Sequence, residues 1–125
     1  MNDLERHDYV LIELAKKAAQ LASEQGSQTS GAALRCGSGN VYTGVDICGD
    51  HGAHAEVVAL GTAKASGETR FECLVVVGGN ALDRIITPCG HCRQLLLEHC
   101  HGLEVIVHIE EHGAKKATTK ELLPY

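Results

Sequence analysis

The sequence predicts an α/β fold, a three-layer α/β/α sandwich built around a mixed sheet. Helical and strand patterns of apolar residues alternate along the chain, and segments of helical length separate the later strands, which favours parallel crossovers. The 125 residues are also expected to form one domain, residues 1–125, because two domains would leave each half too small for a core of its own.

A helix and a β-hairpin are expected in the N-terminal part of the chain. Within residues 4–24, apolar side chains recur every three or four positions, as on one face of a helix. Residues 31–36 and 41–47 are short β-type runs on either side of a turn rich in Gly and Asn. This pattern is typical of a hairpin, which we expect at one side of the sheet.

Two further helices and two strands are expected in the C-terminal part. Residues 71–77 contain an uninterrupted Leu-Val-Val-Val run, as in a strand buried on both faces. Pro88 stands where a helix can begin, since the first turn of a helix does not need its missing N–H group. The expected order is a helix at 54–66, the strand at 71–77, a helix at 90–101, a strand at 104–109 and a short element of undecided type at 118–125.

Composition and charge exclude several classes of function. Apolar residues make up 44% of the chain, and 11 Lys and Arg against 16 Asp and Glu give a net charge of -5. Without a basic run, the chain has no electrostatic basis for binding nucleic acid. No apolar stretch approaches the roughly 20 residues that span a bilayer, and the polar N-terminus is no signal peptide, so we expect no membrane partner and a cytoplasmic location.

The chain has six Cys and eight His, an unusual number for its length. Three disulfides in a small secreted protein would account for the Cys, but a signal sequence is lacking and the Val, Leu and Ala content can build a core. Reduced Cys in a cytosolic protein indicates metal binding, catalysis or packing. We expect packing for Cys36, Cys73 and Cys100.

Two short segments carry the residues suited to chemistry. Cys89 and Cys92 are three apart at the start of the predicted third helix, so both sulfurs can reach one ion and the positive helix end favours their thiolates. His54 and Glu56 stand at the start of the second helix, about 200° apart around its axis. Therefore, we expect His54 to bind metal and Glu56 to contact what is bound to the metal.

His54, Cys89 and Cys92 together form the ligand set of a catalytic zinc site. Three protein ligands leave one position open for water, whose pKa zinc lowers from ~15.7 towards ~7. Glu56 could then accept and pass on a proton. A structural zinc with Cys48 or Cys36 as a fourth ligand is an alternative, although it leaves Glu56 without a role. A redox Cys-Gly-His-Cys motif is less favoured, because no downstream proline is placed to serve it.

The segments His54-Ala55-Glu56 and Pro88-Cys89-Gly90-His91-Cys92 resemble the two-part signature of the zinc-dependent cytidine deaminase superfamily. The resemblance covers most of the chain, and the closing Glu-Leu-Leu-Pro looks most like the blasticidin S deaminases. It implies a cytidine deaminase-like fold, one Zn²⁺ per chain and a homo-oligomer, a tetramer or a dimer.

The same resemblance implies a reaction and a set of substrate contacts. The 4-amino group of a cytosine nucleoside, such as cytidine, deoxycytidine or blasticidin S, would be replaced hydrolytically with release of ammonia, in pyrimidine salvage. Glu56 would carry the protons, and backbone groups around Ala55 and Thr87 would hold the exocyclic amine. The alternatives are a deaminase of another aminated heterocycle and a non-catalytic, zinc-stabilised binding module.

The chain departs from the family where the sugar would bind. Members usually carry Asn-x-Glu after the hairpin, and the matching positions here are Asp46 and Cys48. Asp46 can still accept a hydroxyl hydrogen bond, whereas Cys48 is a poor acceptor. This weakens ordinary ribose recognition and favours an atypical nucleoside. Tyr42 or Tyr125 could supply the aromatic contact that the family takes from elsewhere.

Overall fold

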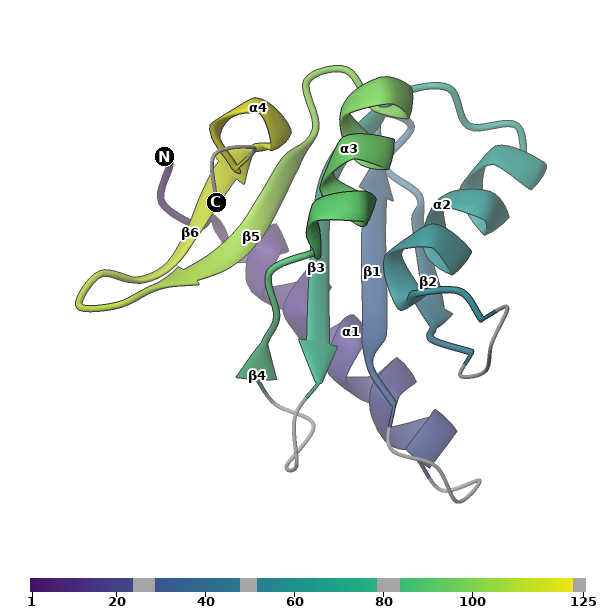
Figure 1. Ribbon diagram of the computed structural model, residues 1–125, viewed down its shortest axis with the longest axis horizontal. Helices are drawn as coiled ribbons and strands as arrows, with labels where there is room; N and C mark the ends of the chain where they lie inside the picture. Colours follow the sequence, from purple (N-terminus) through teal and green to yellow (C-terminus); the bar gives the residue numbers. More distant parts are fainter. Residues whose placement is uncertain (24–28, 48–51, 79–83, 123–125) are drawn as a thin grey trace.

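The computed structural model describes residues 1–23, 29–47, 52–78 and 84–122 of the 125-residue chain (Figure 1). Its elements are α1 (Arg6–Ser23), β1 (Gly31–Cys36), β2 (Val41–Val45), α2 (Ala55–Ala65), β3 (Phe71–Gly78), β4 (Arg84–Ile85), α3 (Gly90–His99), β5 (Glu104–Ile109), β6 (Gly113–Thr118) and α4 (Thr119–Leu122).

The strands form one mixed sheet in the order β2-β1-β3-β5-β6, with β4 paired to β3. Strands β3 and β5 are parallel, and the other pairs are antiparallel. The β1–β2 hairpin lies at one edge, as the sequence predicts. Because β1 is antiparallel to both of its neighbours, β2 and β3 run in the same direction on either side of it. The parallel crossovers through α2 and α3 are therefore confirmed.

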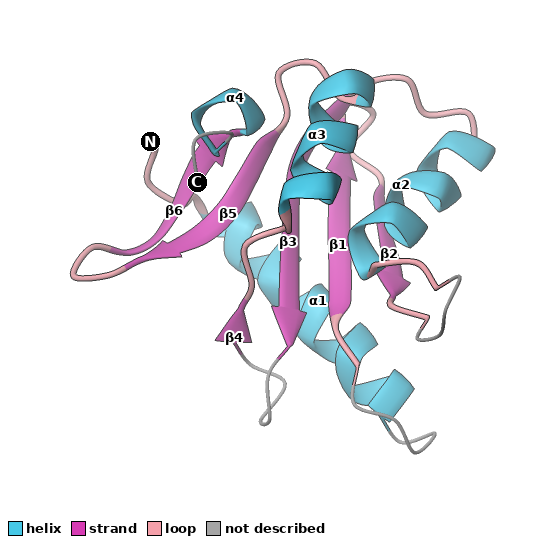
Figure 2. Cartoon of the chain, in the orientation of Figure 1, coloured by secondary structure: helices cyan, strands magenta, loops and turns pink. Residues whose placement is uncertain are grey.

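Helices cover both faces of the sheet, with α1 on one face and α2 and α3 on the other (Figure 2). Strand β3 shows why: Leu74 and Val76 belong to the core cluster under α2 and α3, whereas Cys73, Val75 and Val77 belong to the cluster under α1. Alternate side chains of a strand point to opposite faces, so β3 contributes to both cores. The predicted three-layer α/β/α sandwich is confirmed.

The boundaries differ from the predictions in several places. Helix α1 begins at Arg6, two residues later than expected, and β2 ends at Val45, two residues earlier. Strands β4 and β6 were not expected from the sequence. Strand β6 reads Gly-Ala-Lys-Lys-Ala-Thr and lacks the β-branched apolar alternation that predicts a strand, so its pairing with β5 is set by tertiary context.

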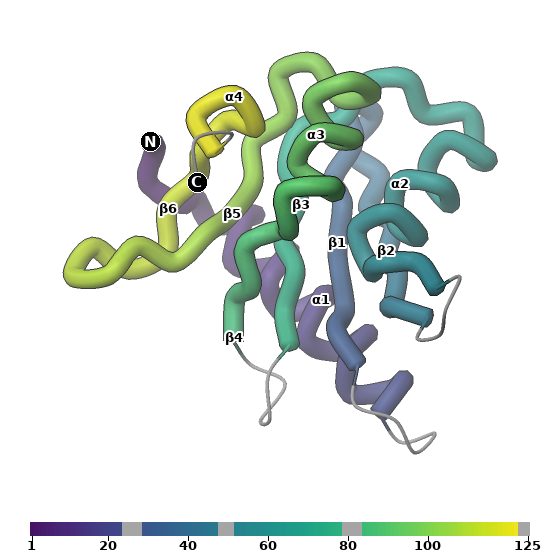
Figure 3. The backbone as a smooth tube through the Cα atoms, viewed as in Figure 1, coloured from purple at the N-terminus to yellow at the C-terminus, as the bar shows by residue number. Residues whose placement is uncertain are grey.

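Helix α2 lies close against β2 because position 44 is a glycine. A Cβ at Gly44 would lie 2.5 Å from the backbone nitrogen of Ala59 and 2.7 Å from the oxygen of Ala55. No side chain fits at such distances, and the lack of one lets the first turns of α2 pack directly on the strand. The first turn of α2 and the first turn of α3 are the turns of these helices that lie nearer to the end of β3 (Figure 3).

A buried ion cluster, Asp8, Arg35 and Lys116, ties α1 to the sheet on the other face. The Asp8 side chain is fully buried and lies 3.0 Å from both Arg35 Nη2 and Lys116 Nζ, and its Oδ2 accepts a hydrogen bond of 2.8 Å from the Glu5 amide. Burial alone would raise the pKa of Asp8, but the Glu5 amide, Lys116 and Arg35 outweigh it and lower that pKa. Asp8 is therefore held as a carboxylate.

Among the described residues, no helix is both long and apolar enough to cross a membrane.

Candidate active site

The starts of helices α2 and α3 place the three predicted metal ligands. His54 is the N-cap residue of α2, with φ -73° and ψ 154°, and Cys89 is the N-cap residue of α3, with φ -65° and ψ 166°. Both have extended backbones, as N-cap residues usually do. Cys92 follows Cys89 by three residues in the first turn of α3 and is buried. Two segments far apart in the sequence thus direct their side chains to one point.

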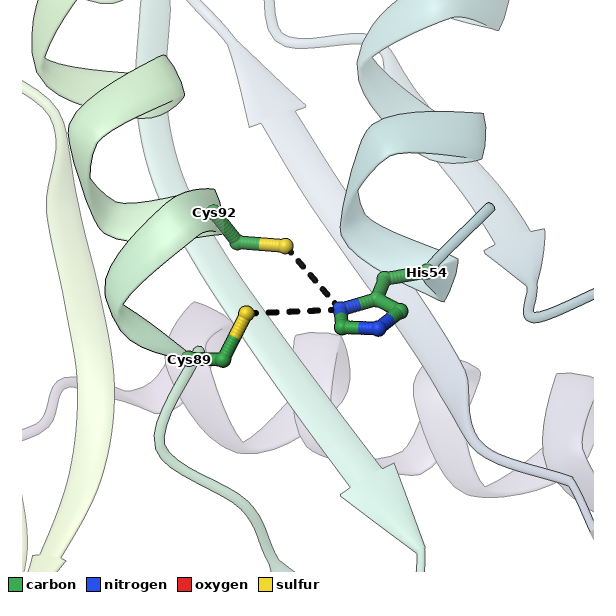
Figure 4. Close-up of side chains that lie close together, drawn as sticks. All are labelled: His54, Cys89 and Cys92. Atoms are coloured by element: carbon green, nitrogen blue, oxygen red, sulfur yellow. Dashed lines mark hydrogen bonds between the residues drawn. The ribbon is translucent and has the colours of Figure 1, made fainter. Parts of the chain in front are cut away.

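The ligand atoms lie at distances that suit one zinc ion (Figure 4). His54 Nδ1 is 3.1 Å from Cys92 Sγ and 3.5 Å from Cys89 Sγ, and all three ligand atoms lie within 4.8 Å of one another. A tetrahedral zinc with ordinary Zn–S and Zn–N bonds requires N···S separations of about 3.6 Å. The residues therefore fit the metal. No other Cys or His among the described residues joins this group, which leaves a coordination position open.

The electrostatic surroundings of Cys92 also favour a cation. Burial raises the pKa of the Cys92 thiol, and the neighbouring Glu56 carboxyl and Cys89 thiol raise it further. Two thiolates beside a buried carboxylate are not stable without a compensating positive charge. A divalent ion supplies that charge, so the donor set itself indicates a metal centre.

Glu56 lies beside these groups and is almost completely buried. Its side chain is 5% exposed, and Oε1 is 3.9 Å from His54 Nδ1. Burial raises the pKa of Glu56, and the negative charge of Asp46 adds to this effect, although the helix backbone, His54 and Cys92 oppose it. A carboxyl group whose pKa is raised binds a proton more readily than an ordinary one, which suits a group that transfers protons.

A cavity of about 230 Å³ opens beside the predicted ligands. Its lining combines metal-binding, acidic, polar and apolar side chains: Ser30, Asp46, His54, Glu56, Val76, Ile86, Thr87 and Cys89. A larger hollow of about 470 Å³ is lined instead by residues such as Arg70, His99 and His101 and includes none of the ligands. The smaller cavity is the candidate substrate site because the reactive groups are there.

Asp46 is fixed in this cavity by the start of β1. Its Oδ1 accepts a hydrogen bond of 2.7 Å from the Ser30 amide and another from the Thr29 hydroxyl. Directly after it, Ile47 and Ala53 exchange two backbone hydrogen bonds of 2.8 and 3.0 Å. This bridge brings the residue after Asp46 opposite the residue before His54. The sequence contains no signal for it, because neither residue lies in a regular strand.

The structure brings most of the predicted site residues together. Asp46 and Thr87 line the cavity with the metal ligands and Glu56, whereas Ala55 is fully buried and not part of the lining. Cys48 lies outside the described residues. Sequence reasoning missed the two apolar walls, Val76 and Ile86, since an apolar residue on a strand or beside it carries no functional signal of its own.

Several predictions for residues outside the site can also be examined. Cys36, Cys73 and Cys100 are buried in the core, as expected, and Cys36 is no fourth ligand. The Tyr42 hydroxyl donates a hydrogen bond of 2.8 Å to Glu68 and does not line the cavity, and Tyr125 lies outside the described residues.

Known proteins resemble the chain in both sequence and structure. Residues 5–109 match the family described as the cytidine and deoxycytidylate deaminase zinc-binding region. A blasticidin-S deaminase from Bacillus cereus is 30% identical over 98% of this chain and 93% of its own length. A cytidine deaminase from Shewanella loihica is 35% identical over 94% of this chain, which spans only 38% of that longer relative.

Solved cytidine deaminases share the fold over almost their whole length. The enzyme from Mycobacterium leprae superposes with a TM-score of 0.75 at 27% identity, covering 98% of this chain and all 100% of its own. The enzyme from Burkholderia pseudomallei gives a TM-score of 0.73 at 31% identity, covering 97% and 98% of the two chains.

Proposed function

The chain belongs to the cytidine and deoxycytidylate deaminase family and is a hydrolytic deaminase acting on C–N bonds, and from this premise we propose that it converts the 4-amino group of a cytosine nucleoside to the uracil form with release of ammonia. One observation carries the proposal: His54, Cys89 and Cys92 converge from two helix starts, and Glu56 is buried beside them. The atoms balance, because water supplies the oxygen that replaces the amine.

In this proposal His54, Cys89 and Cys92 hold one zinc ion per chain. Zinc, when bound at such a site, activates water at neutral pH. Two thiolates offset the charge of the ion and the neutral imidazole adds none, so the metal and its three ligands stay formally neutral, although His54 and Cys89 are exposed.

Glu56 is proposed to move the protons. It accepts a proton from the attacking water and donates it to N3 of the ring, and it then takes the proton of the added hydroxyl group and gives it to the departing amine. Its burial supports this role, because water is largely excluded from the carboxyl and the proton is passed to substrate instead of solvent.

The other cavity residues are proposed to orient the substrate. Val76 and Ile86 form apolar walls suited to the faces of a pyrimidine ring, and the Ile86 amide is tied to the Val76 carbonyl at 2.8 Å, which fixes both. Backbone groups near Ala55 and Thr87 hold the exocyclic amine, and Asp46 contacts the sugar. The proposed assembly is a homo-oligomer, a tetramer or a dimer, which sedimentation can test.

The test combines turnover with metal content. Ammonia release is measured with cytidine, deoxycytidine, blasticidin S and cytosine, and zinc is quantified in the same protein. We expect about one zinc per chain, and loss of turnover on chelation that zinc restores. Glu56→Gln should keep its zinc and lose about 10²–10⁴-fold in kcat. The control is Glu13→Gln, which removes an exposed carboxyl of α1.

Three other results would contradict or change the proposed function. Full activity in Glu56→Gln would remove Glu56 from the reaction. Turnover only of an aminated heterocycle other than cytosine would change the substrate and keep the chemistry. Bound zinc without turnover on a broad panel of such compounds would indicate a non-catalytic, zinc-stabilised binding module.

A further inference from the structure

The two helices that carry the predicted metal ligands are not held equally well. Helix α2 buries five of its eleven residues and packs directly on β2 at Gly44. Helix α3 carries both sulfurs but buries only Cys92 and Leu96 of its ten residues. Because Cys92 is itself a ligand, Leu96 is the one buried apolar anchor of α3 apart from the metal site. The position of the sulfurs therefore depends on further contacts of α3.

Arg93 makes such a contact at the start of α3. It directly follows Cys92, is half-buried, and its Nη1 donates a hydrogen bond of 3.0 Å to the Leu122 carbonyl, at the end of α4. The last carbonyls of a helix have no partner within it, and a basic side chain can bind them. Leu122 is 3% exposed and belongs to the same core cluster as Leu96. Arg93 thus joins the turn that carries the sulfurs to a residue anchored in the core.

The other end of α3 has a contact of its own, away from the sulfurs. Lys64 Nζ, in the last turn of α2, lies 3.4 Å from His99 Nδ1, in the last turn of α3. His99 comes seven residues after Cys92, which places it about 10 Å further along the helix axis. This contact holds the end of the helix, whereas the hydrogen bond of Arg93 holds the turn that carries the ligands.

We propose that Arg93 is a positioning residue for the metal centre, and that its hydrogen bond to Leu122 holds the sulfurs of α3 beside His54 before an ion binds. The inference rests on the zinc site of the proposed function and adds a residue outside the ligand set. Without this hydrogen bond, zinc binding must also bring the first turn of α3 into place. That cost weakens zinc binding, because a preorganised site binds more tightly than one that must be ordered first.

The test measures zinc affinity of the metal-free chain by competition with a chromophoric chelator. The side chain of Arg93→Met cannot donate a hydrogen bond, and the amide of Arg93→Gln ends about two bonds short of the guanidinium nitrogens. We expect both variants to bind zinc about tenfold more weakly than the native chain. Arg93→Lys keeps a donor that ends about one bond short, and it should recover part of the affinity. The control is Lys64→Met, which removes the contact at the other end of α3 and should keep the native affinity.

Urea denaturation with and without zinc separates positioning from a merely structural role. Zinc stabilises the folded chain in proportion to its affinity, so the gain at one free zinc concentration should be smaller in Arg93→Met than in the native chain. A structural role would instead lower both stabilities equally and leave the zinc affinity unchanged. Where Arg93→Met does not fold without metal, Arg93→Gln decides in the same way.

Two results would overturn the inference. One is native zinc affinity in Arg93→Met and Arg93→Gln. The other is an equal loss of affinity in Lys64→Met, which would mean that any loosening of α3 weakens the site. Both leave the proposed function intact, since the native chain still binds zinc in these experiments. A native chain that binds no zinc would defeat the proposed function itself.

Discussion

Two carboxyl groups are buried on opposite faces of the same sheet, and their neighbours give them opposite properties. Asp8 is 0% exposed under α1, between Arg35 and Lys116. Glu56 is almost completely buried at the start of α2, beside Cys92 and the cavity. Burial raises the pKa of both groups. At Asp8 two cations and the Glu5 amide reverse that effect, whereas at Glu56 burial prevails.

The comparison teaches that burial alone does not decide what an acid does. A buried carboxyl that is ion-paired stays ionised and joins elements of the fold, because moving a proton onto it would break the pairing. Glu56 is buried without a Lys or Arg partner among the described residues, so it can take and release protons, and it lines a cavity. The predictions below separate these two situations.

The largest effect is expected from Asp8→Asn. The substitution leaves the buried Lys116 without its carboxylate partner and leaves Arg35 with Glu72, which costs about 3 kcal/mol of the free energy of unfolding. Urea denaturation measures the loss, and kcat/KM per folded chain should stay within about twofold because Asp8 is on the other face of the sheet from the cavity. Equal stability of the variant and the native chain would show that the Asp8 cluster is not stabilising.

A smaller effect is expected from acid. The pKa of Asp8 is lowered in the folded chain from its ordinary value of 3.8, so the folded state binds that proton less tightly than the unfolded state. The resulting stabilisation is complete above about pH 4 and is lost as the pH falls through the lowered pKa. The stability difference between the native chain and Asp8→Asn should therefore shrink below about pH 4. A difference that stays constant down to pH 2 would contradict this account.

The smallest effect is expected from Lys116→Met. Arg35 still pairs with Asp8 in this variant, and the Met side chain fills much of the buried volume, so we expect a loss of about 1.5 kcal/mol. Combining the change with Asp8→Asn measures the coupling, because Lys116 has lost its carboxylate partner once Asp8 is neutral, so replacing it should then restore part of the lost stability. Additive losses would mean that the two residues act independently.

The sequence predicts most of the fold, because most helices and strands follow from the local pattern of apolar and turn residues. The hairpin, the uninterrupted apolar run in β3 and the helix before β5 all follow from side-chain periodicity and turn residues. Strand β6 does not, because Lys115 and Lys116 interrupt any apolar alternation. Their ion pairs with Asp3 and Asp8 and the pairing of β6 with β5 form only in the folded chain.

The site was predicted to a similar extent, for a similar reason. His54, Glu56, Cys89 and Cys92 are recognisable because their residue types and spacing are rare at helix starts, and the structure places them together. Their roles remain proposals. Ile86 and the Ile47–Ala53 bridge could not be predicted, because they depend on segments meeting in space and not on any local pattern.

The lack of a side chain at Gly44 limits which residues this enzyme can have at that position. The first turn of α2 rests on the backbone of β2 at that point, so the thickness of the layer between helix and strand is set there. A single added methyl group would clash with the backbone of α2 and push the helix away from the strand. The helix would tilt, and His54 and Glu56 would move away from the sulfurs of α3. A residue that touches neither substrate nor metal thus sets the alignment on which turnover depends.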